Sequence, residues 1–161
     1  MMRVVIDVNQ SILSKEKKVL ETAGKIPITM SRQHYIKFSL PGTFEHLIEV
    51  GIEKDFSLGY GSINGFRASV ASSFYWYNLK TEKITTLRLY PFCFMDANSF
   101  YEQGFNADQA YEEIGYYFTI CKNVNGTFIS IFHNNFLGTD KQFMGWKEMY
   151  TRFISEMIAG V

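Results

Sequence analysis

The sequence has little of what defines several large classes of protein. It has two cysteines, Cys93 and Cys121, and its 16 Lys and Arg residues balance its 16 Asp and Glu residues. Two cysteines in apolar surroundings are typical of buried thiols rather than of a disulfide framework. A net charge of zero predicts no general attraction to nucleic acid or to an anionic membrane. No apolar run is long enough to span a membrane, and the N-terminal run is too short for a secretory signal. We therefore expect a cytoplasmic protein.

Histidine is also scarce, which bears on metal binding. The chain has only three histidines, His34, His46 and His133, and contains neither a His-x-x-x-His pair nor a paired cysteine spacing. His46 lies beside Glu45 and Glu49 on an expected helix, a pattern typical of a solvated helix face. A catalytic zinc needs three protein ligands and an open position. We therefore expect no metal or other cofactor site within this chain.

Aromatic residues, in contrast, are abundant at 17% of the chain, with 15 Phe and 10 Tyr. Phenylalanine dominates the strand-like runs, so most of the excess is expected in the core. The segment Tyr75-Trp76-Tyr77 alternates faces in a strand. At least one of these rings should therefore be available to a ligand.

The hydrophobic pattern alternates between the periods of strands and helices, which predicts a single α/β domain over residues 1–161. Strands are expected at 3–8, 27–30, 55–60, 74–79, 84–95 and 127–132, and helices at 11–24, 41–51, 106–123 and 141–159. The strands at 74–79 and 84–95, joined by the polar run 80–83, are expected to form a β-hairpin. A Gly- and Ser-containing loop at 61–69 is flexible enough to approach a ligand.

Polar side chains follow the expected strands where each strand ends. Arg32 and His34 follow the strand at 27–30, Asp96 follows the strand that ends at Met95, and His133 follows Phe132. Catalytic groups collect at the carboxyl ends of strands in α/β folds. A carboxylate beside a histidine orients the imidazole and stabilises its charged form. If these strands are parallel neighbours, one rim would carry Arg32, His34, Asp55, Asp96 and His133.

Four segments resemble the C-terminal half of a polysaccharide deacetylase domain of the NodB-homology type, in the variant found in bacterial surface-polysaccharide gene clusters. The matching segments are GKIPITMSRQHYIKFSLPGTFEHLIEVGIEKDFSLGY, GFRAS, LRLYPFCFMD and GTFISIFHNN. The resemblance covers about residues 13–157. It implies a partial (β/α) barrel with a β-hairpin insertion, and hydrolysis of N-acetyl groups on a carbohydrate with the help of a zinc-type ion.

The resemblance also implies roles for individual residues. Arg32 falls in the family's arginine motif, which positions the catalytic base, and Asp55 falls near its following acidic motif. His133 falls on the histidine that protonates the departing amine. Nothing upstream of Arg32 matches the family's acidic pair and metal-binding histidines, and Asp7 is the only acidic residue before the first helix. The resemblance therefore implies a truncated domain that lacks the metal-binding half and is inactive alone.

The candidate site residues fall into two groups. The catalytic candidates are His133, Arg32, Asp55 and Asp96. The substrate-binding candidates are His34, Arg67, Tyr75, Trp76, Tyr77 and Asn134.

Two alternatives to the truncated enzyme remain open at this point. One is a non-catalytic carbohydrate-binding protein that uses the same cleft, with Arg32, Arg67 and the rings of residues 75–77 as contacts. The other is a structural subunit that completes its barrel with a partner chain. A half-barrel leaves strand edges unpaired, so we expect a homodimer, with the first strand, 2–8, at the contact.

Overall fold

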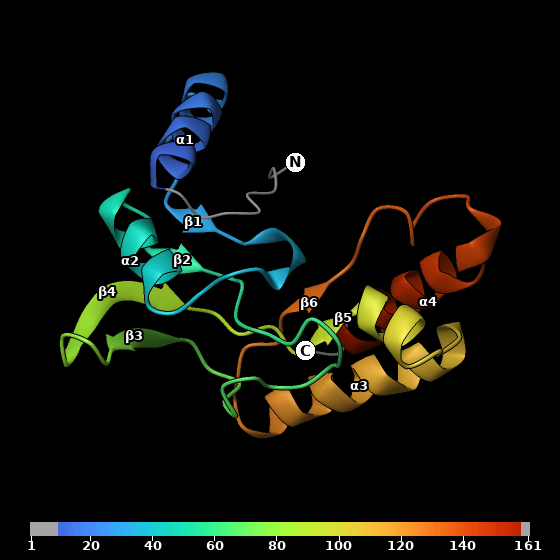
Figure 1. The fold of residues 1–161 in the computed structure, drawn as a ribbon. Helices are drawn as coiled ribbons and strands as arrows, with labels where there is room; N and C mark the ends of the chain where they lie inside the picture. The colour runs from blue at the N-terminus through green and yellow to red at the C-terminus, as the bar shows by residue number, and fades with distance from the viewer. Residues whose placement is uncertain (1–9, 159–161) are drawn as a thin grey trace. The chain divides into compact units, whose positions relative to one another are not determined.

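The computed structural model describes residues 10–158 and divides the chain into two compact units (Figure 1). The first unit takes in the described residues up to Leu58 together with Ser73–Pro91. The second takes in Gly59–Ser72 and the described residues from Phe92 onward. The predicted strand at 3–8, with Asp7, lies outside the described residues. Among residues 10–158, no helix is both long and apolar enough to cross a bilayer.

The first unit is built around a small mixed sheet. Its elements, in chain order, are α1 (Gln10–Gly24), β1 (Met30–Ser31), the 3₁₀ turn η1 (His34–Ile36), α2 (Gly42–Glu49), β2 (Lys54–Asp55), β3 (Phe74–Asn78) and β4 (Lys83–Leu89). The strand order is β1-β2-β4-β3. The pairs β1–β2 and β2–β4 are parallel, whereas β3–β4 is antiparallel. The predicted α/β class and the predicted hairpin are both confirmed.

The hairpin has one buried face and one exposed face. Trp76 and Leu87 are buried, and the ring of Trp76 packs against that of Phe44 on α2, with 5.4 Å between centroids. Tyr75 and Tyr77 alternate with Trp76 and are exposed. The period-two pattern of a strand thus sets the two faces apart, and α2 covers the buried one.

Several predicted elements are shorter or interrupted. The predicted strand 84–95 divides into β4, in the first unit, and β5 (Phe94–Met95), in the second. Pro91 lies between them, and a proline has no N–H to donate to a sheet. The predicted strands at 27–30, 55–60 and 127–132 also reduce to two paired residues each, in β1, β2 and β6 (Ser130–Ile131).

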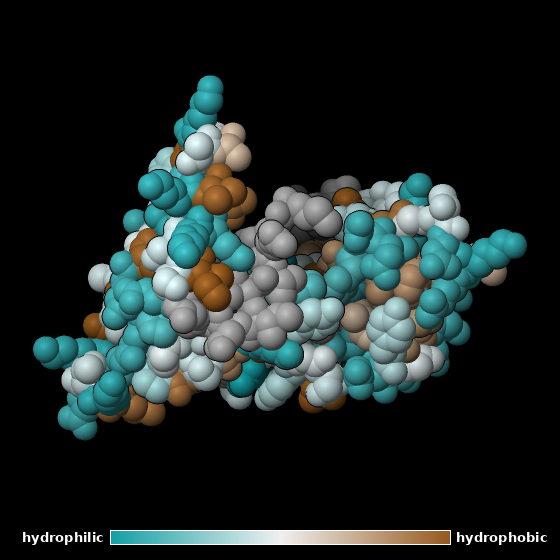
Figure 2. Space-filling model, turned by 45° about the horizontal axis from the view of Figure 1, so that its top comes forward, coloured by the Kyte–Doolittle hydropathy of each residue, from teal (hydrophilic) through white to brown (hydrophobic). Residues whose placement is uncertain are grey.

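Helix α1 confirms the predicted helix at 11–24, beginning one residue earlier, at Gln10. Leu13 is its only buried residue, whereas Val19 and Leu20 are exposed. Figure 2 shows hydrophobic side chains among hydrophilic ones along this helix. Its amphipathic pattern is therefore only partly used for packing within the described residues.

The second unit combines a two-stranded sheet with helices. Its elements, in chain order, are β5, the π-helical turn η2 (Asn98–Glu102), α3 (Ala107–Asn123), β6, the 3₁₀ turn η3 (Lys141–Phe143), α4 (Trp146–Phe153) and the π-helical turn η4 (Ile154–Ile158). Strands β5 and β6 pair in parallel. Helix α3 confirms the predicted helix at 106–123, and Asn106 and Gln109 form a reciprocal capping box at its N-terminus. The predicted helix at 141–159 is broken at Gly145, where φ is 90°, a backbone conformation that favours glycine.

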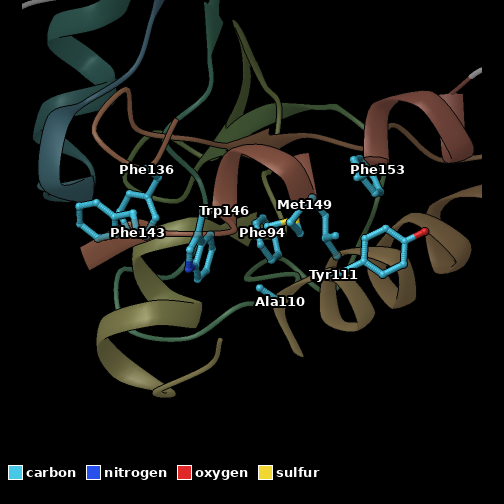
Figure 3. Close-up of a cluster of buried hydrophobic side chains, with 9 residues drawn as sticks. Phe94, Ala110, Tyr111, Phe136, Phe143, Trp146, Met149 and Phe153 are labelled. Carbon is cyan, nitrogen blue, oxygen red and sulfur yellow. The ribbon is translucent and has the colours of Figure 1, made fainter. Parts of the chain in front are cut away.

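An aromatic core fills the space between α3 and α4 (Figure 3). The ring centroids of Phe136 and Phe143 lie 4.1 Å apart, and those of Phe136 and Trp146 lie 4.9 Å apart. Figure 3 shows Met149 and Tyr111 farther along the same cluster, beyond Phe94. Much of the phenylalanine excess is thus core, as the sequence predicts.

The loop at 59–72 approaches the second unit's core so closely that one position requires glycine. A Cβ added at Gly59 would lie 2.2 Å from the ring of Phe92, which is buried. We expect Gly59→Ala to lower the free energy of unfolding by about 1–3 kcal/mol, because an overpacked core must shift its side chains. Chemical denaturation followed by circular dichroism measures this. Gly61→Ala is the matched control, since a Cβ there has no neighbour within 4 Å. Equal effects of the two variants would contradict the steric argument.

Candidate functional site

The strongest candidate site lies where β5 and β6 end side by side. Their register pairs Met95 with Ile131, so the residues that follow these strands, Asp96 and His133, meet at one edge. Oδ1 of Asp96 lies 2.6 Å from Nδ1 of His133. The same carboxylate accepts the backbone N–H groups of His133 and Ala97. The predicted carboxylate neighbour of His133 is therefore confirmed as Asp96.

Burial of this pair is asymmetric. The Asp96 side chain is 0% exposed, whereas the His133 side chain is 36% exposed. The hydrogen bond to Asp96 raises the pKa of His133 above its ordinary value of 6.5, and partial burial opposes that rise. Because an ionised carboxylate can only accept a hydrogen bond, Nδ1 of His133 carries the proton in this contact. Nε2 is then the ring nitrogen that can exchange a proton with a substrate.

A network of buried polar side chains holds the Asp96 strand end in place. Oδ1 of Asn64 accepts the N–H of Met95 at 2.8 Å. Nδ2 of Asn64 donates to Oγ of Ser99 at 2.9 Å and to Oε2 of Glu113 at 2.8 Å. Ser99 also donates to Glu113 at 2.6 Å. Asn64 thus joins the loop at 61–69 to β5, to η2 and to α3.

Asn98 extends this network into the loop. Its Nδ2 donates to the carbonyl oxygens of Tyr60 and Ile63, at 3.2 and 2.7 Å. It lies in η2, and π-helical turns are frequent at functional sites. No motif in the sequence indicates Asn64, Asn98 or Ser99. The three polar residues among positions 96–99, directly after an apolar strand, are the signal that could have identified the last two.

Asp55 forms a second buried cluster, in the first unit. It is 0% exposed and accepts from Oγ of Ser31 at 2.7 Å and from Oγ of Ser57 at 2.9 Å. Its other oxygen accepts the N–H of Ser57 at 2.9 Å. Burial raises the pKa of Asp55, and these hydrogen bonds oppose the rise. Ser31 and Asp55 are paired in the β1–β2 register, so the cluster joins two neighbouring parallel strands.

Arg32 lies at the edge of this cluster. Its Nε donates to the carbonyl oxygen of Phe56 at 3.3 Å. Burial lowers the pKa of Arg32, and the charge of Asp55 opposes that change. Arg32 is therefore near enough to Asp55 for the carboxylate charge to act on its pKa, and among the contacts of the described residues no hydrogen bond joins the two side chains.

The predicted rim belongs to two different units. Arg32, His34 and Asp55 are in the first unit, and Asp96 and His133 are in the second. Within each unit, the strands next to these residues pair in parallel, as such a rim would require. A single rim that carries all five residues stays a prediction.

The substrate-binding candidates are dispersed. His34 is exposed in η1, edge-on to Tyr35, and Asn134 is exposed in the turn after β6. Arg67 donates to the carbonyl oxygen of Gly59 at 3.2 Å. Trp76 requires a correction: its ring is 8% exposed, because it packs under α2. Trp76 is therefore a core residue of the first unit and offers little surface to a sugar, unlike Tyr75 and Tyr77.

The described residues do not fit the zinc ion that the family resemblance implies. No group of three or more His, Cys, Asp or Glu side chains comes together within residues 10–158 to hold a metal ion. The Asp96–His133 pair offers at most two metal ligands, and Nδ1 of His133 already contacts Asp96. A catalytic zinc needs three protein ligands. The pair is suited to proton transfer.

Neither a protein-family model, nor a curated protein, nor a solved structure gives a significant match to this chain. The similarity to polysaccharide deacetylases therefore stays a prediction from the sequence.

Proposed function

We propose that this chain carries the proton-transfer part of a carbohydrate N-deacetylase of the polysaccharide deacetylase type, in a partial (β/α) barrel. The observation that supports the proposal is the Asp96–His133 pair, which follows two parallel strands and joins a buried carboxylate to a partly exposed imidazole. The parallel pairs β1–β2, β2–β4 and β5–β6 are those that a (β/α) barrel would use.

His133 has the properties of a general acid. Amide hydrolysis expels an amine, and the departing nitrogen must gain a proton. The raised pKa of His133 keeps more of the imidazole charged near neutral pH. Asp96 holds the ring through Nδ1, so the proton on Nε2 is the one that is transferred. Asp96 is a positioning residue in this scheme. Asn64 holds the end of β5 by accepting the N–H of Met95.

We further propose that the chain forms a homodimer. Among the described residues, strands β1 and β3 are the edges of the first unit's sheet, and an edge strand presents backbone groups that another chain can pair with. A net charge of zero offers little repulsion against association. Sedimentation velocity at micromolar concentration should give the mass of a dimer, and a clean monomer would contradict this part of the proposal.

The function is tested by adding an N-acetylated oligosaccharide to the full chain. We expect tetra-N-acetylchitotetraose to shift the NMR ring signals of His133 without release of acetate, because the zinc-binding half of the family site has no match in the sequence. The ring signal of His46, in the first unit, serves as an internal control, and cellotetraose, which lacks N-acetyl groups, is the matched ligand. No response at His133, or the same response to cellotetraose, would contradict the proposed role. One tight zinc site together with acetate release would contradict the inactivity of the chain alone.

A further inference from the structure

One face of the first unit's sheet carries aromatic rings and cations. Side chains in β2 and β4 alternate, so that Asp55, Leu87 and Leu89 are buried, whereas Lys54 and Arg88 point to the opposite face and are paired in register. Tyr75 is paired with Arg88 and shares this face. We call this surface the aromatic–cationic face, and it consists of Lys54, Phe56, Tyr75, Tyr77, Arg88 and Tyr90.

Aromatic contacts fix the guanidinium of Arg88 on this face. The guanidinium lies 5.7 Å from the ring centroid of Tyr75 and 5.6 Å from that of Tyr90. Its Nε donates to Oγ of Ser73 at 3.0 Å. The Tyr90 ring stacks on that of Phe56, with 4.8 Å between centroids. Arg88 is therefore held in one orientation, and the N–H groups of its terminal nitrogens donate to no side chain or carbonyl among the described residues, so they can bind a ligand.

Among residues 10–158, no acidic side chain pairs with these cations. Asp55 is the only acidic residue in the four strands of this sheet, and it is buried with Ser31 and Ser57. Within the described part of the chain, neither Arg88 nor Lys54 forms an ion pair. In a chain with no net charge, two unpaired cations beside exposed tyrosine rings are complementary to a ligand that is both anionic and flat-faced.

We propose that the aromatic–cationic face binds an anionic polysaccharide. Carboxylates of the sugar contact Arg88 and Lys54, and the apolar faces of its rings stack on Tyr75 and Tyr77. The contacts extend over β3, β4 and β2, about 10 Å across two strand spacings, a distance that linked sugar rings can span. A single-stranded nucleic acid would also stack on tyrosine, but it carries a charge at each nucleotide and is matched by a longer row of cations than this face has. This inference concerns binding in the first unit and does not depend on proton transfer by His133.

The test is a titration of the full chain with an octamer of α-1,4-linked galacturonate, measured by calorimetry. Neutral maltooctaose and the oligonucleotide dT8 are the comparison ligands. Arg88→Gln and Tyr75→Ala should each weaken binding of the galacturonate octamer by about tenfold, which corresponds to one lost charged contact or one lost stacking contact. Tyr75→Phe keeps the ring and should retain binding. The matched controls are Lys147→Gln and Tyr116→Ala, both exposed and both in the second unit, and circular dichroism verifies that each variant is folded.

Binding of the galacturonate octamer that weakens with added salt, and that only the variants at positions 75 and 88 impair, supports the proposal. Equal binding of maltooctaose overturns the role of the cations, and tighter binding of dT8 overturns the ligand class. No binding of any ligand, or equal losses in the controls, overturns the site itself.

Discussion

Replacing Asp96 with alanine should lower the free energy of unfolding of the second unit by roughly 3 kcal/mol. Three donors use this buried carboxylate, namely Nδ1 and the N–H of His133 and the N–H of Ala97. Each donor left without its buried acceptor costs about 1 kcal/mol. Denaturation followed by the fluorescence of Trp146, which is in this unit's core, measures the loss in a background where the other tryptophan, Trp76, is replaced with phenylalanine.

Asp96→Asn should, in addition, lower the pKa of His133, because the hydrogen bond to Asp96 is the largest contribution that raises this pKa. A histidine whose pKa is raised on folding stabilises the fold most fully below its unfolded pKa of about 6.5. That contribution is lost as the pH rises through the folded pKa. We therefore expect the unfolding free energy of the parent chain to fall over this range, and Asp96→Asn to flatten the fall. An NMR titration of the His133 ring gives the pKa directly.

The control for both Asp96 variants is Glu112→Gln, an exposed carboxylate on α3 in the same unit. It should leave both the stability and the His133 titration nearly unchanged. A parent chain in which His133 titrates at or below 6.5, or an Asp96→Asn variant with an unchanged titration, would contradict the assignment of the pair.

Phe136→Ala should lower the free energy of unfolding of the second unit by about 3–5 kcal/mol. Phe136 is 1% exposed, and its ring contacts those of Phe100, Phe143 and Trp146. Its removal leaves a cavity among residues that are themselves held by aromatic contacts and have little freedom to close it. Chemical denaturation of the full chain, followed by near-ultraviolet circular dichroism, measures the change.

Phe136→Leu keeps most of the volume and should cost clearly less than Phe136→Ala. Tyr116→Ala removes a comparable ring from an exposed position of the same unit and should change stability by no more than about 0.5 kcal/mol. If the three variants proved equal, the cluster in Figure 3 would not be the unit's main source of stability.

Local signals in the sequence predicted the elements that local interactions determine. The hydrophobic pattern predicted a helix at 106–123, which matches α3 to within one residue. Alternation and a polar turn predicted the hairpin. The meeting of Asp96 with His133 followed from one simple rule, that the ends of neighbouring parallel strands lie together.

Features that depend on distant parts of the chain were not predictable in this way. Alternation shows that Trp76 and Tyr75 face opposite sides, but the position of α2 decides that Trp76 is the buried one. The partners of Asn64 are 31–49 residues away in sequence, and no spacing rule relates them. The division of the expected strand 84–95 between two sheets also depends on tertiary pairing, although Pro91 marks the place where pairing stops.

The route of the backbone through the two units limits how they can be separated. The chain leaves the first unit after Leu58, returns at Ser73 and leaves again after Pro91. A single proteolytic cut within the loop at 59–72 would therefore divide the first unit between two fragments. Residues 73–91 would stay covalently joined to the second unit, and the N-terminal fragment would be held to them by noncovalent contacts such as the β2–β4 pairing. Truncation that removes the whole first unit would also remove residues 59–72 of the second unit, so an autonomous second unit would require joining residues 59–72 directly to Phe92.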